Sequence, residues 1–373
     1  MKYMGSKRSM LLNGLGDLLA DTAPTAKRFV DLFAGSGAVA IHVATKYAIP
    51  VVASDLQQYS AVLAGAVLER KTELEWEKTW LDWHASAKEV YSRQRPPKVN
   101  RITKKAVDEF RDWSLRRRSL PLTKAYGGHY YSPVQAVWID SFRASLPEEK
   151  QAQKVALAAL LHVASRCAAS PGHTAQPLQP ARNANTYIAE AWEKDVPALS
   201  KEFFSALSRL YAKRVGITKT VDANQAADDV KETDLVFIDP PYSGVQYSRF
   251  YHVLESVATG SPGDVSGTGR NPTPEMRPHS RYSIITGAKK AFSELLSKLG
   301  TKGAKCIVTF PAHECSNGLS GEAVREIALE HFKVKEKLVQ SKFSTLGGVN
   351  VEVGNGRTAR HAAEELILTL SPK

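Results

Sequence analysis

The stretch Asp234-Leu-Val-Phe-Ile-Asp239-Pro240-Pro241-Tyr242 joins an apolar segment to a polar and rigid end. The residues between Asp234 and Asp239 are typical of a buried strand in a parallel sheet. Proline cannot continue a central strand, so we expect the strand to end at Asp239. Ligands of open α/β sheets bind beyond the C-terminal ends of the strands. We therefore expect Asp239, the Pro240 carbonyl and the Tyr242 ring to face a binding cleft.

This strand end carries the groups needed to activate an exocyclic amine. The amino group of adenine is a poor nucleophile because its lone pair is delocalised into the ring. The Asp239 carboxylate and the Pro240 carbonyl would accept its N–H hydrogens and free the lone pair, while Tyr242 stacks on the base. The alternative is a strand end closed by an ordinary polar turn, for which X-Pro-Pro is common.

The composition is that of a soluble globular protein. The chain has 373 residues, of which 43% are hydrophobic and 24% are charged. It has no apolar run long enough to span a membrane and no signal peptide. Cys167, Cys306 and Cys315 are scattered and fit a reducing compartment, and the spacing of His162, Cys167 and His173 matches no zinc pattern. We expect a cytoplasmic protein with no membrane partner and no metal.

The charge distribution favours a polyanionic partner. The net charge is +12, and residues 86–124 contain 12 Lys or Arg against 4 Asp or Glu. Aromatic residues in or just after this stretch suit a surface that meets phosphates and bases. A solvated helix face is the alternative. The candidate nucleic-acid contacts here are Arg116, Arg117, Arg118, Lys124 and Tyr130.

A glycine turn follows an earlier apolar strand. In Arg28-Phe-Val-Asp-Leu-Phe-Ala-Gly-Ser-Gly37, the residues Gly35 and Gly37 allow close backbone approach to a ligand at a helix N-terminus. The spacing also satisfies the dinucleotide fingerprint, which is a weak signal alone. Asp31 suits an ammonium group and would repel a pyrophosphate, and Phe33 precedes the glycines. These features favour S-adenosylmethionine over a nicotinamide cofactor.

Acidic residues end two further strands. Asp55 follows the strand that begins at Val51 and is placed to bind a ribose hydroxyl pair, although it could also cap the next helix. Asp222 ends the strand that begins at Ile217, and capping of the following helix is its alternative role.

The alternation of strands and helices indicates an α/β fold with one large insertion. We expect a doubly wound, Rossmann-like domain from residues 1–70 and 215–373, with a helix at 9–20. A terminal antiparallel hairpin of residues 333–343 and 364–370 would close the sheet, with 347–360 as its loop. Residues 71–214 indicate an inserted, mainly helical target-recognition domain. Residues 260–281, which include the candidate DNA contact Arg270, are interpreted as a loop that closes over substrate, with plain surface disorder as the alternative.

The order of these motifs resembles that of the Dam-like, alpha-group DNA adenine-N6 methyltransferases. The resemblance rests on Lys2-Tyr-Met-Gly-Ser-Lys7, Asp31-Leu-Phe-Ala-Gly-Ser-Gly37, Asp55, Asp222 and Asp239-Pro-Pro-Tyr242. It covers residues 1–70 and 215–373, and the insertion matches no recognition domain that we can name. The Leu-Phe-Ala after Asp31 departs from the Pro-Phe-Val that bacterial relatives often have.

The resemblance implies an S-adenosylmethionine-dependent methyltransferase that acts on a flipped adenine. It assigns catalysis to Asp239, Pro240, Pro241 and Tyr242, and cofactor binding to Tyr3, Lys7, Asp31, Phe33, Gly35, Gly37, Asp55, Asp222 and Asp239. The first two cofactor residues would also contact the target, with a packing role for Tyr3 and a solvated cation at Lys7 as alternatives. His252 fits helix packing better than proton transfer.

We therefore expect a site-specific DNA adenine-N6 methyltransferase whose partner is double-stranded DNA. Base readout in the major groove would fall to the inserted domain, with Arg143, Asn183 and Asn185 as candidates. N4-cytosine methylation, RNA adenine methylation and a catalytically silent DNA-binding module of the same fold are the alternatives. A homodimer and a cognate restriction endonuclease are left open as further partners.

Overall fold

The computed structural model describes residues 7–344 and 360–373. The described chain forms two compact units. The sheet unit consists of residues 7–56, 213–247, 279–344 and 360–373, and the helical unit consists of residues 57–212 and 248–278. Contacts thus group residues 57–70 and 248–278 with most of the expected insertion, and the functional boundaries at 70/71 and 214/215 stay a prediction.

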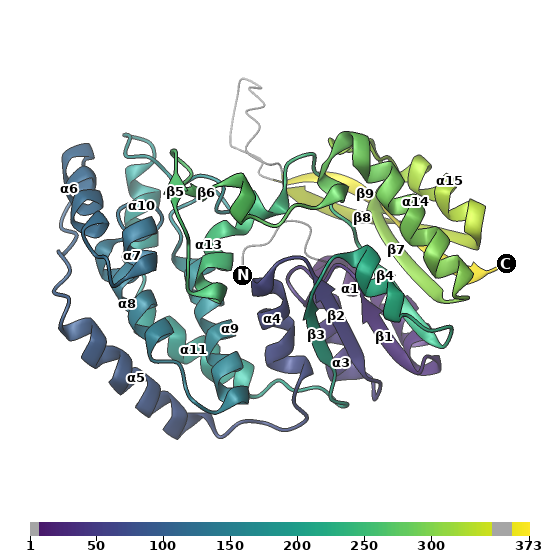
Figure 1. Cartoon of the computed structure of the whole chain (residues 1–373), viewed down its shortest axis with the longest axis horizontal. Helices are drawn as coiled ribbons and strands as arrows, with labels where there is room; N and C mark the ends of the chain where they lie inside the picture. Colours follow the sequence, from purple (N-terminus) through teal and green to yellow (C-terminus); the bar gives the residue numbers. More distant parts are fainter. Residues whose placement is uncertain (1–6, 345–359) are drawn as a thin grey trace. The chain divides into compact units, whose positions relative to one another are not determined.

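The sheet unit is built on a mostly parallel sheet with the strand order β3-β2-β1-β4-β7-β9-β8 (Figure 1). Strand β1 pairs in parallel with β2 on one side and with β4 on the other, and β4 pairs in parallel with β7. The strands are β1 (Arg28–Asp31), β2 (Val51–Asp55), β3 (Ile217–Thr220), β4 (Asp234–Ile238), β7 (Lys305–Pro311), β8 (Phe332–Ser344) and β9 (Arg360–Pro372). This order confirms the expected doubly wound, Rossmann-like α/β fold.

A terminal antiparallel hairpin closes the sheet, as expected. Strand β9 runs antiparallel to both β7 and β8, with Phe332 opposite Pro372 and Pro311 opposite Glu365. Residue 360 begins β9, and the rest of the expected hairpin loop lies outside the described residues. The register brings Glu365 to the C-terminal end of β7.

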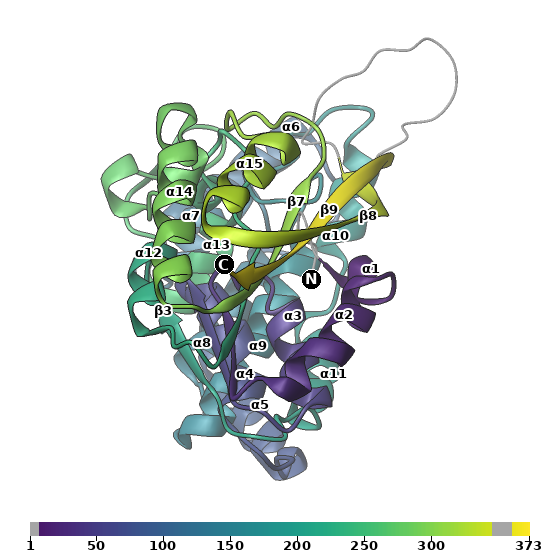
Figure 2. The ribbon, with the colours of Figure 1, turned by 90° about the vertical axis from the view of Figure 1, so that its right-hand side faces the viewer.

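Helices cover both faces of this sheet. Side chains of α12, α14 and α15 form one apolar core with Val30, Val236 and Val308 of the strands. The alternate strand residues, such as Phe29 and Phe237, point to the other face, where α3 packs on β1 and β2 (Figure 2). The helices are α1 (Arg8–Leu11), α2 (Leu15–Thr22), α3 (Ala38–Lys46), α12 (Ala223–Ala226), α14 (Ile285–Thr301) and α15 (Gly321–His331).

The single helix expected at residues 9–20 is wrong in one respect. The chain forms two helices there, α1 and α2, and they are separated at Gly14, whose φ is 89°. A left-handed residue cannot continue a right-handed helix, and glycine adopts that conformation at little cost. The apolar periodicity runs through both helices, which is why the break escapes a pattern-based prediction.

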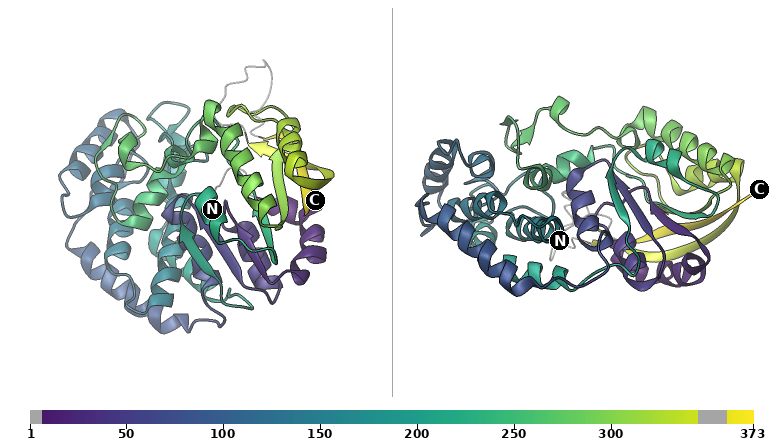
Figure 3. Two further views of the ribbon diagram at one scale, coloured as in Figure 1. Left: turned by 45° about the vertical axis from the view of Figure 1, so that its right-hand side comes forward. Right: turned by 60° about the horizontal axis from the view of Figure 1, so that its bottom comes forward.

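The helical unit is mainly α-helical, as expected for the insertion (Figure 3). Helices α4, α8 and α11 pack around α9, whose Val155, Leu160 and Val163 are fully buried. Its helices are α4 (Gln58–Leu68), α5 (Trp76–Ser92), α6 (Lys104–Leu115), α7 (Pro121–Tyr126), α8 (Pro133–Ala144), α9 (Lys150–Cys167), α10 (Asn185–Trp192), α11 (Val196–Ser208) and α13 (Tyr247–Thr259). Across the described ranges, no helix has the length and apolarity that a membrane crossing requires.

The segment after α13 has some regular structure. Strands β5 (Val265–Ser266) and β6 (Asn271–Pro272) pair as a short antiparallel hairpin. Single turns of 3-10 helix follow at Pro274–Met276 and Arg281–Ser283. The segment is therefore ordered in this structure, and its closing movement stays a prediction.

Candidate active site

Asp239 lies directly after β4 and belongs to a cluster of charged side chains in the sheet unit. The Lys7 Nζ lies 3.1 Å from Asp239 Oδ1 and donates to Glu365 Oε2 at 2.7 Å. The Thr309 hydroxyl donates to the same Asp239 Oδ1 at 2.9 Å. Among the contacts of the described residues, none uses Asp239 Oδ2, so this oxygen is left for a ligand.

The electrostatics of the cluster keep an acceptor and a cation close together. Burial raises the pKa of Asp239 to about 6, and the Lys7 ammonium opposes this rise. Burial alone lowers the pKa of Lys7, but the Asp239 and Glu365 carboxylates raise it above its usual value. Asp239 is therefore mostly ionised at pH 7 and Lys7 is charged. The alternative of a solvated Lys7 is wrong, since only 5% of its side chain is exposed.

The residues after Asp239 form a rigid rim. The Asn317 amide donates to the Pro241 carbonyl at 2.8 Å and to the Tyr282 carbonyl at 3.0 Å, which fixes the chain after the two prolines. No hydrogen bond within the described part of the chain engages the Pro240 carbonyl. The Tyr242 ring is half-buried and stands edge-on to Tyr247 at a centroid distance of 6.2 Å.

The glycine turn lies beside this rim because β1 and β4 are neighbours. Asp31 pairs with Phe237 in the sheet, so the C-terminal ends of both strands meet at one edge. Gly35 and Gly37 have φ values of 51° and 74°, and Gly37 begins α3. The structure thus brings the expected cofactor turn and the Asp239 segment together.

Asp31 is a buried carboxyl next to this turn. The Phe33 N–H donates to its Oδ1 at 3.2 Å, and the Phe33 ring packs edge-on against Tyr282 at 5.0 Å. Burial, with a smaller contribution from Asp239, raises the pKa of Asp31 to about 8. No cation contacts Asp31 within the described ranges, and burial of such an acid costs folding energy, so its position suits a positively charged ligand group.

Asp55 ends β2 and shapes the same turn. Its Oδ2 accepts the Gly35 N–H at 2.8 Å, and its side chain is half-buried. The cap of α4 comes from another residue, because the Glu255 carboxylate accepts the N–H groups of Gln58 and Tyr59, each at 2.9 Å. Asp55 thus lies at the edge of the sheet, where a ribose contact was expected.

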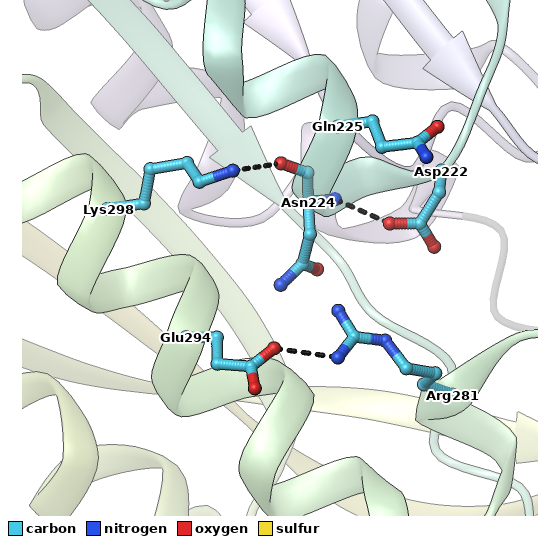
Figure 4. Close-up of a pocket in the computed structure, with 6 residues that line it drawn as sticks. All are labelled: Asp222, Asn224, Gln225, Arg281, Glu294 and Lys298. Atoms are coloured by element: carbon cyan, nitrogen blue, oxygen red, sulfur yellow. Dashed lines mark hydrogen bonds and ion pairs between the residues drawn. The ribbon is translucent and has the colours of Figure 1, made fainter.

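Asp222 caps a helix, as its alternative role required. Its Oδ1 accepts the Asn224 N–H at 2.9 Å at the start of α12. A pocket of about 510 Å³ lies beside it (Figure 4). In this pocket Arg281 binds Glu294 at 2.6 Å, and the Lys298 ammonium donates to the Asn224 carbonyl at 2.7 Å. The lining residues are Asp222, Asn224, Gln225, Arg281, Glu294 and Lys298.

Several of the expected DNA contacts are exposed in the helical unit. Arg116, Arg118 and Lys124 are exposed near the C-terminal end of α6 and on α7, and Asn183 is exposed before α10. Arg117 is half-buried, and its guanidinium lies 4.2 Å from the ring centre of Trp113. These positions suit phosphate contacts, and their role stays a prediction.

Other expected DNA contacts are used by the fold. Tyr130 is fully buried, and its hydroxyl donates to the carbonyls of Thr174 and Gly269, so we no longer propose it as a DNA contact. The Arg143 guanidinium donates to the Val257 and Ala258 carbonyls at 2.8 and 3.1 Å at the end of α13. Tyr130 shows that an aromatic residue beside a basic stretch need not face solvent.

Two more side chains turn inward to hydrogen bonds. Asn185 donates to the Ile102 carbonyl at 3.2 Å, and Arg270 donates to the Ala125 carbonyl at 2.9 Å.

His252 is buried against Tyr126 and Tyr130, and burial lowers its pKa to about 4. Its expected packing role is confirmed. Tyr3 lies outside the described residues.

The sequence reasoning missed two residues of the charged cluster. Thr309 is a polar residue inside the apolar strand β7 next to β4, which is a weak but readable signal. Glu365 follows Glu364 at the start of an apolar run, and only the strand register reveals that it is buried while its neighbour is exposed.

Comparison with protein families gives a match over most of the chain. The model of the D12 class N6 adenine-specific DNA methyltransferases matches residues 3–133 and 182–299. The match includes the N-terminal motif, the glycine turn and the Asp239 segment. It also extends into the expected insertion, which the motif-based resemblance did not reach.

Two curated proteins are also similar to the chain. Modification methylase LlaI of Lactococcus lactis subsp. lactis is 25% identical over 323 residues, which are 80% of this chain and 44% of that protein. Type II methyltransferase M.FokI of Planomicrobium okeanokoites is 25% identical over 308 residues, which are 80% of this chain and 43% of that protein. The chain thus spans less than half the length of these relatives.

Proposed function

Because this chain belongs to the D12 class of N6 adenine-specific DNA methyltransferases, we propose that it transfers a methyl group from S-adenosylmethionine to the exocyclic amine of an adenine in duplex DNA. The observation that carries the proposal is the Asp239 carboxylate at a rigid strand end, whose Oδ2 has no contact among the described residues, beside a glycine turn with a buried acid. Family membership itself implies a methyl donor.

The residues around the glycine turn fit S-adenosylmethionine. Asp31 is a buried carboxyl with a pKa raised to about 8 by burial, and a bound ammonium group would pair with its ionised form. Gly35 and Gly37 keep side chains away from the turn, and Asp55 would accept ribose hydroxyls. Asp222 and its pocket are the candidates for the adenine end of the cofactor. When bound, this donor supplies an electrophilic methyl group and its sulfur takes the electron pair of the broken bond.

The chain's own part in the reaction is to prepare the acceptor amine. Asp239 Oδ2 and the Pro240 carbonyl would accept the N–H hydrogens of the target amine, which frees the nitrogen lone pair to form the new bond. Tyr242 would stack on the extruded base and hold its plane. Asp239 would also accept the proton that the nitrogen then loses.

The helical unit would supply the binding energy for DNA. Its exposed Arg116, Arg118 and Lys124 suit phosphates, which give affinity without sequence information. The two curated relatives are named a modification methylase and a type II methyltransferase, which favours a modification role for this chain. In that role methylation would protect sites from a cognate endonuclease. The endonuclease, a homodimer and a cytoplasmic location stay predictions.

The product identifies the reaction. The protein is incubated with S-adenosylmethionine and either duplex DNA or RNA, and the nucleosides are analysed by mass spectrometry. We expect N6-methyladenine in DNA only. Methylcytosine alone, methyladenine only in RNA, or binding without any methyl transfer would each replace the proposal with one of its rivals.

A further inference from the structure

Glu365 is a buried charge within the active site that no motif marks. It lies on the closing strand β9, and 7% of its side chain is exposed. The Lys7 ammonium contacts Glu365 at 2.7 Å and Asp239 at 3.1 Å, so one cation serves two carboxylates. Asp239 is the most accessible member of the cluster, with 18% of its side chain exposed against 5% for Lys7.

We propose that Glu365 is a positioning residue for methyl transfer, which holds Lys7 and adds a second negative charge to the Lys7–Asp239–Glu365 cluster that stabilises the positive charge the amine nitrogen gains in the reaction. This inference rests on the proposed function. Counted over the described residues, one ammonium and two carboxylates give this cluster a net negative charge. A lone Lys7–Asp239 pair would be neutral.

The geometry shows why the third charge matters. Both Lys7 and Thr309 contact Asp239 Oδ1, and the closer contact of Lys7 is with Glu365. Glu365 thereby anchors the ammonium that contacts Asp239 Oδ1. As the amine nitrogen forms its bond to carbon it gains positive charge, which a net negative cluster stabilises at short range in a partly buried site.

The cluster also determines the protonation of Asp239. The titratable groups that act on Asp239 from the described elements are Lys7 before α1, Glu365 on β9, Tyr242 beyond β4 and Asp31 on β1. Of these, Lys7 lowers the pKa of Asp239 and Glu365 raises it. Loss of the Glu365 charge must therefore move the ionisation of Asp239 to lower pH.

The experiment measures single-turnover methyl transfer to duplex DNA from pH 5 to 9 with saturating cofactor, using Glu365→Gln. We expect the plateau rate to fall about tenfold or more, while the midpoint of the acid limb moves down by about one pH unit. The matched control is Glu364→Gln, which removes the same charge from the exposed neighbour. It should keep the wild-type rate and midpoint.

Glu365→Asp separates charge from packing, since it keeps the carboxylate on a shorter arm. For Glu365→Asp we expect a reduced plateau rate and the wild-type midpoint of the acid limb. If Glu365→Gln has a much lower melting temperature than Glu364→Gln, the Glu365→Asp variant provides the test of the inference. A Glu365→Gln profile equal to that of Glu364→Gln, or a shifted midpoint in Glu365→Asp, overturns the inference. A wild-type protein that makes no N6-methyladenine overturns the proposed function itself, so the two failures are distinguishable.

Discussion

The proposed binding residue Asp31 lowers the stability of the free protein at alkaline pH. Burial raises its pKa to about 8, so the folded protein binds this proton more tightly than the unfolded chain does. Stability therefore falls as the pH rises from the ordinary range of a carboxyl, near 4, to about 8. A bound ammonium would reverse this effect by pairing with the ionised form.

Replacement of Asp31 by Asn should stabilise the free protein at alkaline pH. The gain over wild type should be small at pH 5 and reach a few kcal/mol at pH 8.5, because each unit of pKa shift corresponds to about 1.4 kcal/mol. Urea unfolding at both pH values measures it, with the exposed Asp21→Asn as control. The same variant should bind S-adenosylmethionine at least tenfold more weakly by calorimetry. If the gain in stability of Asp31→Asn over wild type were the same at pH 5 and pH 8.5, burial would not raise the pKa of Asp31 as described.

Tyr242 should matter through its ring and not through its hydroxyl. Tyr242→Ala should weaken capture of the target base by about 1–3 kcal/mol, the usual worth of base–aromatic stacking, whereas Tyr242→Phe should keep most of it. Duplex DNA with 2-aminopurine at the target position reports base extrusion by its fluorescence. An undiminished signal with the Ala variant would remove the stacking role.

Sequence motifs predict some residues of the site and miss others. Asp239, Asp31 and Asp55 could be predicted because each follows an apolar strand, and strand ends of a parallel sheet meet at one edge. Glu365 could not, because its burial depends on the register of a strand that pairs with β7 far away in sequence. Tyr130 and Arg143 look like surface residues in a basic context, but the fold uses their polar groups.

At the scale of elements, the cap of α4 comes from a distant helix. Glu255 on α13 accepts the first N–H groups of α4, at Gln58 and Tyr59. A carboxylate at a helix N-terminus satisfies orphan donors and interacts favourably with the helix dipole. Sequence reasoning looked for this cap in Asp55, the nearest acid, because contacts between distant segments are invisible to local patterns.

Removal of this cap should destabilise the helical unit. Glu255→Ala is expected to cost about 1–2 kcal/mol, the typical loss when a helix cap is removed. Chemical denaturation followed by circular dichroism tests it, and Glu190→Ala on the exposed face of α10 serves as the control. If the two variants lose the same stability, the Glu255 contacts contribute nothing specific.

Strands proved easier to predict than helix boundaries. Strands β1, β2 and β4 are short, largely apolar runs that end in an aspartate or directly before one, and this pattern has few alternatives. The helix expected at 9–20 failed because its apolar spacing continues across Gly14, where the backbone changes hand. The pairing of β9 between β7 and β8 was only partly readable, as a hairpin without its place in the sheet.

At the scale of the whole molecule, the net charge of +12 is concentrated where DNA binding is expected. In residues 86–124 all the Lys and Arg side chains except Arg111 and Arg117 are exposed. Each cation that neutralises a phosphate adds about 0.9 to the slope of log affinity against log salt. The predicted DNA-binding role of this stretch can therefore be tested by salt dependence.

Removal of Arg116 and Arg118 should weaken DNA binding and flatten its salt dependence. We expect the slope to fall by about 2 for the double Ala variant. The control removes two exposed cations, Lys27 and Lys305, which precede β1 and begin β7 at the N-terminal edge of the sheet. Fluorescence anisotropy at a series of salt concentrations measures both. A control variant that loses as much slope would indicate a general charge effect.

The most direct measurement compares wild-type protein with Asp239→Ala on the same duplex DNA, with N6-methyladenine quantified by mass spectrometry and DNA affinity measured in parallel. Wild type should form N6-methyladenine, and the variant should form none while its DNA affinity stays within a few-fold, since affinity lies with the phosphate-contacting cations. Methylation by Asp239→Ala at the wild-type rate would contradict the role of this carboxylate, as would a parallel loss of DNA affinity.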